Sequence, residues 1–304
     1  MTIGVAGTMP LLSVVIPTYN RADYIAQTIE SVLAQDYGKL EIIVIDDGST
    51  DNTAEVVARY ARHVRYIRQE NGERGASRNR GLRLAAGEYV AFLDSDDRWL
   101  PGKAAAGVDA LQSHPTAGLL CTDAIQIDAD GVQTGQLYAG GRSGCVTDQL
   151  LRRNFVIMPT NLARTSIVRQ IGGFREEREL SGSEDWEMWV RLSLAAEILY
   201  VPSATAEYRV HSANTVSSAA GMERSMARAA ELFRGSEQLS PTHRRNFQRM
   251  DANIALVNAI NFCWEDRRRS LRLLGGAISA DPRIMLDPRF GYTLYRILKS
   301  SAGL

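Results

Sequence analysis

The segment AFLDSDDRWLP, from Ala91 to Pro101, carries three carboxylates directly after an apolar run. Neighbouring carboxylates repel one another, and each is costly to remove from water. A solvated acidic turn is one explanation for Asp94, Asp96 and Asp97. A bound divalent cation is the other, because hard cations prefer oxygen ligands. The segment therefore predicts a Mg²⁺ or Mn²⁺ site at Asp94 and Asp96, with an acidic turn as the alternative.

Two further polar clusters follow apolar runs, VVIPTYNR and VIDDGSTDNT. Asp46 and Asp47 could accept hydrogen bonds from a nucleotide base or a ribose hydroxyl, although turn and helix-capping chemistry uses the same residue types. Tyr19 offers a ring on which a base could stack, and Pro17 ends the preceding run. The alternative for this pair is a strand-terminating proline beside a half-buried tyrosine.

The segment RGASRNRG places Arg78 and Arg80 in the first turns of an expected helix. A guanidinium there could pair with a diphosphate, whereas solvated arginines on a surface helix are the simpler explanation. The helix dipole disfavours cations near an N-terminus unless an anion is present. This consideration favours an anion-binding role.

Carboxylates also occur in GSEDWEMWVRL, where Glu184 and Asp185 begin an expected helix. Acidic residues are common at helix starts, but a carboxylate at the mouth of an acceptor pocket could serve as a general base. In EYRVHSANT, His211 could be a metal ligand, a phosphate contact or a packed polar side chain.

These clusters need a scaffold that brings them together. Apolar runs at 11–16, 40–45, 64–67 and 89–93 predict buried strands, and the segments 23–35, 52–61 and 76–86 predict the helices between them. Such alternation predicts a mostly parallel sheet covered by helices on both faces. Ligands of these sheets gather at the carboxyl ends of the strands, where the clusters around Tyr19, Asp47 and Asp96 fall.

The remainder of the chain changes character. The segment 118–138 predicts two strands joined by a turn at Asp130 and Gly131, and 197–211 predicts a strand pair or one strand with a long tail. From Gly221 onward the pattern is helical.

The composition narrows the function classes. The 304 residues include 35 basic and 35 acidic side chains, so the formal net charge of zero gives no overall field that would favour nucleic acid. The three cysteines (Cys121, Cys145 and Cys263) are widely spaced and odd in number, which argues against a disulfide framework or a zinc site and fits a reducing compartment. The chain shows no signal-peptide pattern and no apolar run of membrane-spanning length. We expect a cytoplasmic protein.

Arginines concentrate near the C-terminal end of the sequence. A solvated basic helix face is the simpler explanation, and contact with an anionic membrane surface or a lipid-linked acceptor is the hypothesis beside it. The residues concerned are Arg244, Arg245, Arg249, Arg267, Arg268, Arg269 and Arg272.

The order of the motifs resembles the inverting nucleotide-sugar glycosyltransferases of family 2, which have the GT-A fold. The likeness rests on SVVIPTYNR, EIIVIDDGSTDNT, GASRNRGLRLAAGEYVAFLDSDD, IGGFRE, SEDWEMWVRL and YRVHSANT, from Leu11 to Ser218. It implies a GT-A domain over residues 1–218, with a nucleotide-sugar half at about 11–100 and an acceptor half at 101–218. A helical region at 219–304 lies outside the resemblance.

The resemblance also implies a role for each matching position. Nucleotide-sugar binding is expected from Pro17, Tyr19, Asp46, Asp47, Arg78, Asp94 and Ser95. The metal, Mn²⁺ or Mg²⁺, is expected at Asp96 first, with Asp94 and His211. Asp185 matches the catalytic base, and Phe174, Glu184 and Trp186 are expected on the acceptor side.

The implied reaction is a metal-assisted single displacement from a nucleotide sugar, UDP-sugar first, to a hydroxyl of a glycan, a lipid-linked molecule or another acceptor of the cell surface. One alternative is a non-catalytic nucleotide-sugar-binding protein on the same fold. Another is a phosphotransferase with Asp46 or Asp94 as nucleophile. A dinucleotide-dependent oxidoreductase would need G-x-G-x-x-G after the first strand, where PTYNR stands instead.

Overall fold

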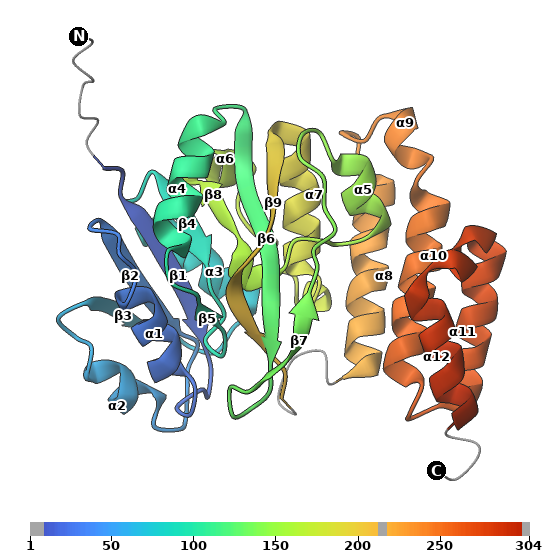
Figure 1. The fold of residues 1–304 in the computed structure, drawn as a ribbon, viewed down its shortest axis with the longest axis horizontal. Coiled ribbons are helices and arrows are strands. Elements are labelled where there is room, and N and C mark those ends of the chain that lie inside the picture. The colour runs from blue at the N-terminus through green and yellow to red at the C-terminus, as the bar shows by residue number, and fades with distance from the viewer. Residues whose placement is uncertain (1–8, 212–217, 300–304) are drawn as a thin grey trace. The chain divides into compact units, whose positions relative to one another are not determined.

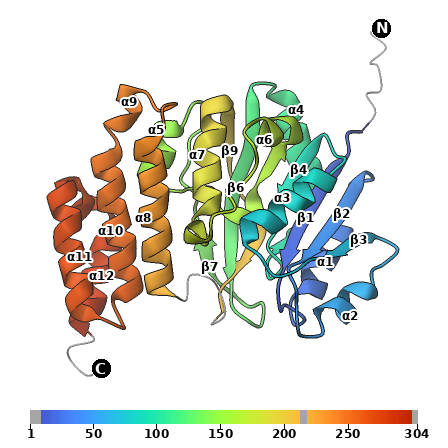
Figure 2. The same cartoon turned by 180° about the vertical axis from the view of Figure 1, so that it is seen from behind.

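A computed structural model describes residues 9–211 and 218–299 (Figures 1 and 2). The chain divides into two compact units. The first comprises Met1–Cys145, Phe155–Glu176 and Arg191–His211, and the second Val146–Asn154, Glu177–Val190 and Ser212–Leu304. The domain boundary expected after residue 218 stays a prediction.

The first unit is built on a nine-stranded sheet with the order β3-β2-β1-β4-β8-β6-β9-β5, and β7 pairs with β6. The strands are β1 Leu12–Thr18, β2 Leu40–Asp46, β3 Val64–Arg68, β4 Tyr89–Phe92, β5 Arg98–Trp99, β6 Ala117–Ile127, β7 Gln133–Leu137, β8 Leu162–Arg164 and β9 Glu197–Arg209. The first four strands pair in parallel, and β8 joins them to the rest through antiparallel pairs. The mostly parallel sheet expected from the apolar runs is confirmed.

Helices cover both faces of this sheet, as predicted. Figure 1 shows α1 Ile25–Leu33 and α4 Lys103–Ser113 over one face, and Figure 2 shows α3 Arg74–Leu84 and α6 Thr165–Gln170 over the opposite face. The short helix α2 Thr53–Ala58 follows β2.

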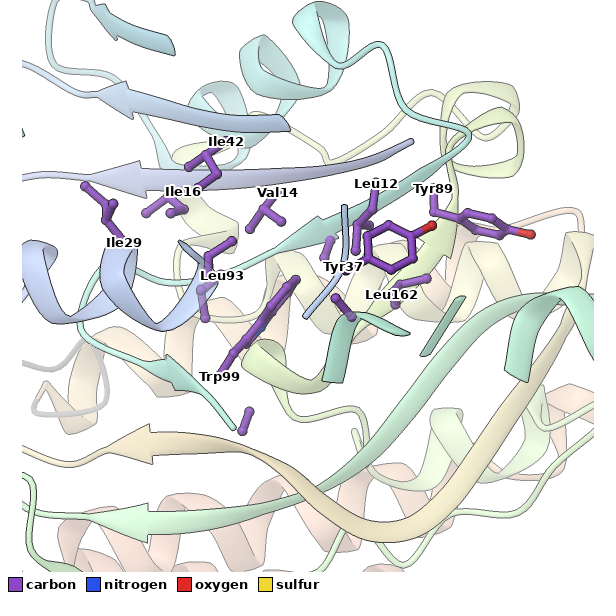
Figure 3. Packing of buried hydrophobic residues seen from close by; sticks show 14 of the residues in the cluster. Leu12, Val14, Ile16, Ile29, Tyr37, Ile42, Tyr89, Leu93, Trp99 and Leu162 are labelled. Carbon is purple, nitrogen blue, oxygen red and sulfur yellow. The ribbon is translucent and has the colours of Figure 1, made fainter. Parts of the chain in front are cut away.

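The side-chain alternation of β1 explains how the two faces are filled. Val14 and Ile16 point into the cluster that includes Ile29 of α1 (Figure 3). Val15 points to the other face and packs directly against Gly81 of α3. A Cβ atom added to Gly81 would lie only 2.2 Å from Cγ1 of Val15. Both faces of the strand are therefore buried, which is why its sequence is a continuous apolar run.

The later strands follow the sequence prediction in outline. β6 and β7 form the expected hairpin, and Asp128 closes its turn by accepting hydrogen bonds from the amides of Asp130 and Val132. The segment that predicted either a strand pair or one strand with a tail is a single strand, β9.

The second unit is helical, as expected for the residues after Gly221. Its core joins Leu256 and Ala259 of α10, and Cys263 directly after that helix, to Leu274 of α11 and Ile297 of α12. The helical elements that bear on it are α5 Thr147–Arg152, η2 Arg178–Leu180, α7 Glu184–Ala195, α8 Ala219–Gly235, α9 Pro241–Arg244, α10 Phe247–Phe262, α11 Arg267–Ala280, η4 Pro282–Leu286 and α12 Pro288–Lys299; α7 runs from the second unit into the first. Within residues 9–211 and 218–299, none of the helices has the length and apolarity needed to cross a membrane.

A lysine lies buried among the helices and strands of the first unit. Lys103 is 3% exposed, and its ammonium group donates to the carbonyl oxygen of Thr160 at 2.7 Å. The group also lies 5.2 Å from the ring centroid of Trp99. Burial lowers the pKa of Lys103 to about 7, because an ammonium group loses its hydration there.

Replacement of Lys103 by methionine should remove a pH dependence of stability. Above pH 7 the native side chain loses its proton, while the unfolded chain keeps it up to about pH 10.4. In this window the unfolded state of the wild type binds one proton more than its native state. The free energy of unfolding of the wild type, measured relative to that of Lys103→Met, should therefore rise by about 1.4 kcal/mol per pH unit. Urea denaturation of both proteins from pH 7 to 10 measures this difference.

The matched control is Lys39→Met, which removes a lysine at an exposed position. A difference between wild type and Lys103→Met that stays constant across the window would contradict the prediction.

Candidate active site

The loops after β1 and β2 are joined by one asparagine. Asn20 has a positive φ of 50°, a conformation that asparagine tolerates better than most residues. Its Oδ1 atom accepts from the amides of Thr50 (2.8 Å) and Asp51 (3.4 Å), and its own amide donates to Oγ of Ser49 at 2.9 Å. The two strand ends that carry Tyr19 and Asp47 are thereby held together.

The expected nucleotide-pocket residues lie at these strand ends. Pro17 is half-buried within β1, opposite Ile45, at a point beyond the last residue of β1 that pairs with β4. Proline has no backbone N–H group, but at this position no hydrogen bond to β4 is lost. Tyr19 is 46% exposed, so its ring is accessible for stacking. Oδ1 of the buried Asp47 accepts from Gln69 (2.7 Å) and from the amide of Gly72 (3.1 Å).

Asp46 has a different environment from Asp47. It is fully buried, its Oδ1 atom accepts from the amide of Ser49 at 2.8 Å, and its Oδ2 atom accepts from the hydroxyl of Tyr66. Both carboxylate oxygens thus stabilise the turn and the neighbouring strand β3.

The first acidic side chain after β4 is paired with the helix arginine. Arg78 is 1% exposed and donates to Oδ1 of Asp94 at 2.7 Å. Burial alone would raise the pKa of Asp94, but the charges of Arg78, Arg74 and Arg21 hold it below its usual range. Beneath this pair lies Phe174, whose ring centroid is 5.3 Å from the Arg78 guanidinium carbon and which is almost completely buried. Phe174 therefore supports Arg78.

Asp96 lies between an arginine and a histidine. Its Oδ2 atom is 3.3 Å from Nε of Arg21 and 3.0 Å from Nε2 of His211. The imidazole of His211 packs against the ring of Tyr24, with centroids 4.9 Å apart and the ring planes tilted by 34°. The ends of β4 and β9 therefore bring Asp96 and His211 together, as expected, although 115 positions separate them. Residues 212–215 of the motif YRVHSANT lie outside the described residues.

The third acid of the segment is part of the supporting structure. Asp97 is 1% exposed, and its Oδ1 atom accepts from the amide of Arg209 at 2.8 Å. Burial, together with the negative charges of Asp96 and Asp94, raises the pKa of Asp97 well above its usual range. Arg209, fully buried, donates through Nε to the carbonyl of Asp96 at 2.8 Å and through its other nitrogens to Gln27 and the β6–β7 turn.

The side chains at Asp96 fit a divalent cation that the protein coordinates only in part. Oδ2 of Asp96 and Nε2 of His211 lie 3.0 Å apart and could both be ligands. Mg²⁺ or Mn²⁺ is commonly held by one or two carboxylates together with phosphate oxygens. Asp94 is partly exposed beside them, and Ser95 between them is buried. In the part of the chain that the structure describes, no group of three or more His, Cys, Asp or Glu side chains is arranged as a closed metal cage.

Asp185 belongs to the second unit, at the start of α7. Its Oδ1 atom accepts from the amide of Trp186 at 2.6 Å, and Nδ2 of Asn154 donates to its Oδ2 atom at 3.2 Å. Glu184 is buried and accepts from the amide of Gly182 at 2.6 Å. Trp186 is also buried; its indole donates to the carbonyl of Leu150 at 2.7 Å and packs edge-on against Phe233.

Several of the residues that orient these groups were not predicted from the sequence. Arg21 ends the quoted motif PTYNR, and Arg209 lies two positions before His211, on the same side of an extended strand. That spacing could have identified Arg209. No comparable signal marked Asn154, because its contact with Asp185 depends on the fold of the second unit.

A model of the family described as Glycosyl transferase family 2 matches residues 13–164, half of the chain. The chain belongs to glycosyl transferase family 2. It is accordingly an enzyme, a glycosyltransferase, as the motifs predicted.

Curated relatives support this assignment to family 2. A protein of Bacillus subtilis whose name places it in teichuronic acid biosynthesis is 46% identical over 99 residues, which is 31% of this chain and 39% of that protein. Uncharacterized glycosyltransferases of Rickettsia species are 29–31% identical over about two thirds of this chain, and the chain spans from 29% to 67% of their lengths.

Solved structures establish the GT-A fold expected for family 2. S. aureus TarS in complex with UDP has a TM-score of 0.64 at 22% identity, covering 95% of this chain and 88% of that one. A mannosyltransferase from Pyrobaculum calidifontis in complex with GDP-Man and Mn²⁺ has a TM-score of 0.65 at 19% identity, covering 95% and 85%.

Proposed function

We propose that this glycosyltransferase moves a sugar from a nucleotide diphosphate sugar, a UDP-sugar first, to a hydroxyl acceptor with inversion at the anomeric carbon. The observation that carries the proposal is the cluster at the strand ends of the first unit. There Arg21 pairs with Asp96 and Arg78 pairs with Asp94. His211 also contacts the carboxylate of Asp96. Cationic side chains and a metal-binding pair in one place suit a diphosphate leaving group.

The residues of the cluster have separable roles in this proposal. Tyr19 stacks on the base, and Asp47 accepts from the base or ribose, since its side chain is positioned by Gln69 and Gly72. Arg78 contacts the diphosphate, with Phe174 beneath it. Asp96 and His211 would hold Mn²⁺ or Mg²⁺, with Asp94 beside them. When bound, the cation neutralises charge on the departing diphosphate.

Asp185 acts as the general base in the proposed displacement. Its carboxylate takes the proton of the acceptor hydroxyl while that oxygen forms a bond to the anomeric carbon, and the bond from that carbon to the phosphate oxygen breaks. Hydrogen bonds from Trp186 and Asn154 orient the carboxylate, and the N-terminus of α7 favours a negative charge there.

The acceptor is proposed to be a polysaccharide, glycolipid or other glycan of the cell surface. The name of the Bacillus subtilis relative supports this class, since it places that protein in teichuronic acid biosynthesis. TarS with UDP and the mannosyltransferase with GDP-Man and Mn²⁺ support uridine and guanosine diphosphate sugars as the first donors to try.

A screen of UDP- and GDP-sugars with and without Mn²⁺ tests the proposal. A ligand at a hundred times its Kd stabilises the native state by about 2.7 kcal/mol, so the cognate donor should raise the unfolding temperature in the presence of Mn²⁺. The donor that does so should then release its nucleoside diphosphate when an acceptor hydroxyl is supplied, and NMR should show the inverted anomer. If no nucleotide sugar shifts the transition with the metal present, the proposal is wrong.

A further inference from the structure

Helix α12 has an apolar outward face. Thr293 and Ile297 are buried against the second unit, while Tyr292, Tyr295 and Leu298 on the other side are 59%, 58% and 57% exposed. A surface helix of a globular protein normally has polar residues on its outward face. The outward face of α12 is therefore more apolar than that of an ordinary water-facing helix.

The apolar surface continues onto neighbouring elements of the second unit. Leu286 of η4 is 85% exposed, and Trp264 after α10 is 61% exposed. The guanidinium of Arg296 lies 4.5 Å from the ring centroid of Trp264 and 5.4 Å from that of Tyr292, so it joins α12 to the turn after α10. We refer to these exposed residues together as the C-terminal apolar surface; they are Trp264, Met285, Leu286, Tyr292, Tyr295 and Leu298.

The charge around this surface is one-sided. From Arg267 to Lys299 the sequence has eight basic and two acidic residues, although the whole chain is neutral. Both acids of this segment pair with arginines, Asp281 with Arg249 and Arg283, and Asp287 with Arg289. The segment thus has a clear excess of positive charge beside exposed aromatic and aliphatic side chains.

We propose that the C-terminal apolar surface docks onto an anionic lipid bilayer. Tyrosine and tryptophan combine an apolar ring with a polar tip, and Lys and Arg keep their charged heads at the headgroup level, so this composition suits a membrane interface. Negatively charged headgroups complement the basic segment. A second copy of the chain fits less well, because a twofold interface would place the basic segment against itself.

Several arginines of the cluster noted in the sequence, for which membrane contact was the hypothesis beside a solvated basic face, are engaged within the protein. Arg244 donates to the carbonyls of Leu239, Arg234 and Ser236, and Arg249 and Arg269 pair with Asp281 and Glu223. Those guanidinium groups already have protein partners. The docking therefore rests on the face of α12, and it does not depend on the proposed donor chemistry.

Flotation of the 304-residue chain with vesicles tests the inference. Wild type should float at low salt with vesicles of equal parts phosphatidylcholine and phosphatidylglycerol, should bind pure phosphatidylcholine at least about tenfold less, and should be released at about 1 M salt, where the Debye length is about 3 Å. Tyr295→Glu/Leu298→Glu should weaken binding about a hundredfold, since two apolar side chains no longer enter the bilayer.

The matched control is Val132→Glu/Tyr138→Glu, which adds the same charges at two exposed apolar positions of the first unit (60% and 69% exposed) and should bind as wild type. Thermal unfolding checks that both double variants fold, and Lys299→Glu provides a milder second variant. Absence of wild-type flotation at low salt would overturn the inference, as would equal binding of Tyr295→Glu/Leu298→Glu. A dimer in light scattering that this double variant dissociates, without vesicle binding, would assign the surface to a second copy instead.

Discussion

Replacement of Asp185 by asparagine should lower the turnover number by about a hundred- to ten-thousandfold while the nucleotide-sugar donor still binds. Asparagine has nearly the same shape, and its Oδ1 atom can still accept from the Trp186 amide. An amide cannot take the proton of the acceptor hydroxyl, however, and base catalysis of this kind contributes a factor of about 10² to 10⁴. The loss should therefore appear in kcat, with donor binding retained.

The measurement combines donor titration by calorimetry with nucleoside diphosphate release at saturating donor and acceptor. Glu231→Gln is the matched control, because it neutralises a 66% exposed carboxylate on α8 of the same unit. It should turn over as wild type does. Near-normal turnover of Asp185→Asn would remove this residue from the role of base.

Replacement of Asp96 by asparagine should instead weaken binding of Mn²⁺ on the order of a hundredfold or more. Changing even a side chain that only supports a metal ligand costs about 10- to 100-fold in affinity, and here the proposed ligand itself loses its negative charge. The amide oxygen can still accept from Arg21, so the loop should keep its shape. Donor binding should then become insensitive to the cation.

Paramagnetic resonance of free Mn²⁺ in the presence of UDP, with GDP in parallel, measures this affinity directly. The control is Asp130→Asn, which neutralises an exposed aspartate in the β6–β7 turn. If Asp96→Asn titrates as wild type does, with and without a chelator, Asp96 is not a metal ligand. Since the readout is binding, this result is independent of the outcome for Asp185.

The parallel half of the sheet could be predicted from the sequence because its strands are buried on both sides. LEIIVID and LSVVIPT read as apolar runs that end at polar residues, and the structure places β2 and β1 there within two residues. The strands β5 and β8 were not predicted. They are two and three residues long, too short for any periodicity, and they exist only because longer strands pair with them.

The candidate site shows the same division between local and long-range information. The positions of Asp47 and Asp96 at strand ends could be predicted, because each strand end appears in the sequence as a change from apolar to polar residues. The pairing of Arg21 with Asp96 spans 75 positions, and that of Arg209 with the Asp96 carbonyl spans 113. Likewise, only the three-dimensional structure shows that Tyr66 occupies one carboxylate oxygen of Asp46.

Arg209 connects the acidic segment to a distant surface hairpin. The same guanidinium that holds the Asp96 carbonyl also donates to the carbonyls of Asp128 (3.2 Å) and Ala129 (2.9 Å) in the β6–β7 turn. An insertion or deletion in that turn would move two of its anchors and shift the backbone of Asp96 with them. Changes in the length of this hairpin would therefore reposition the acidic segment for which we propose the cation site, although the two segments lie far apart in the sequence.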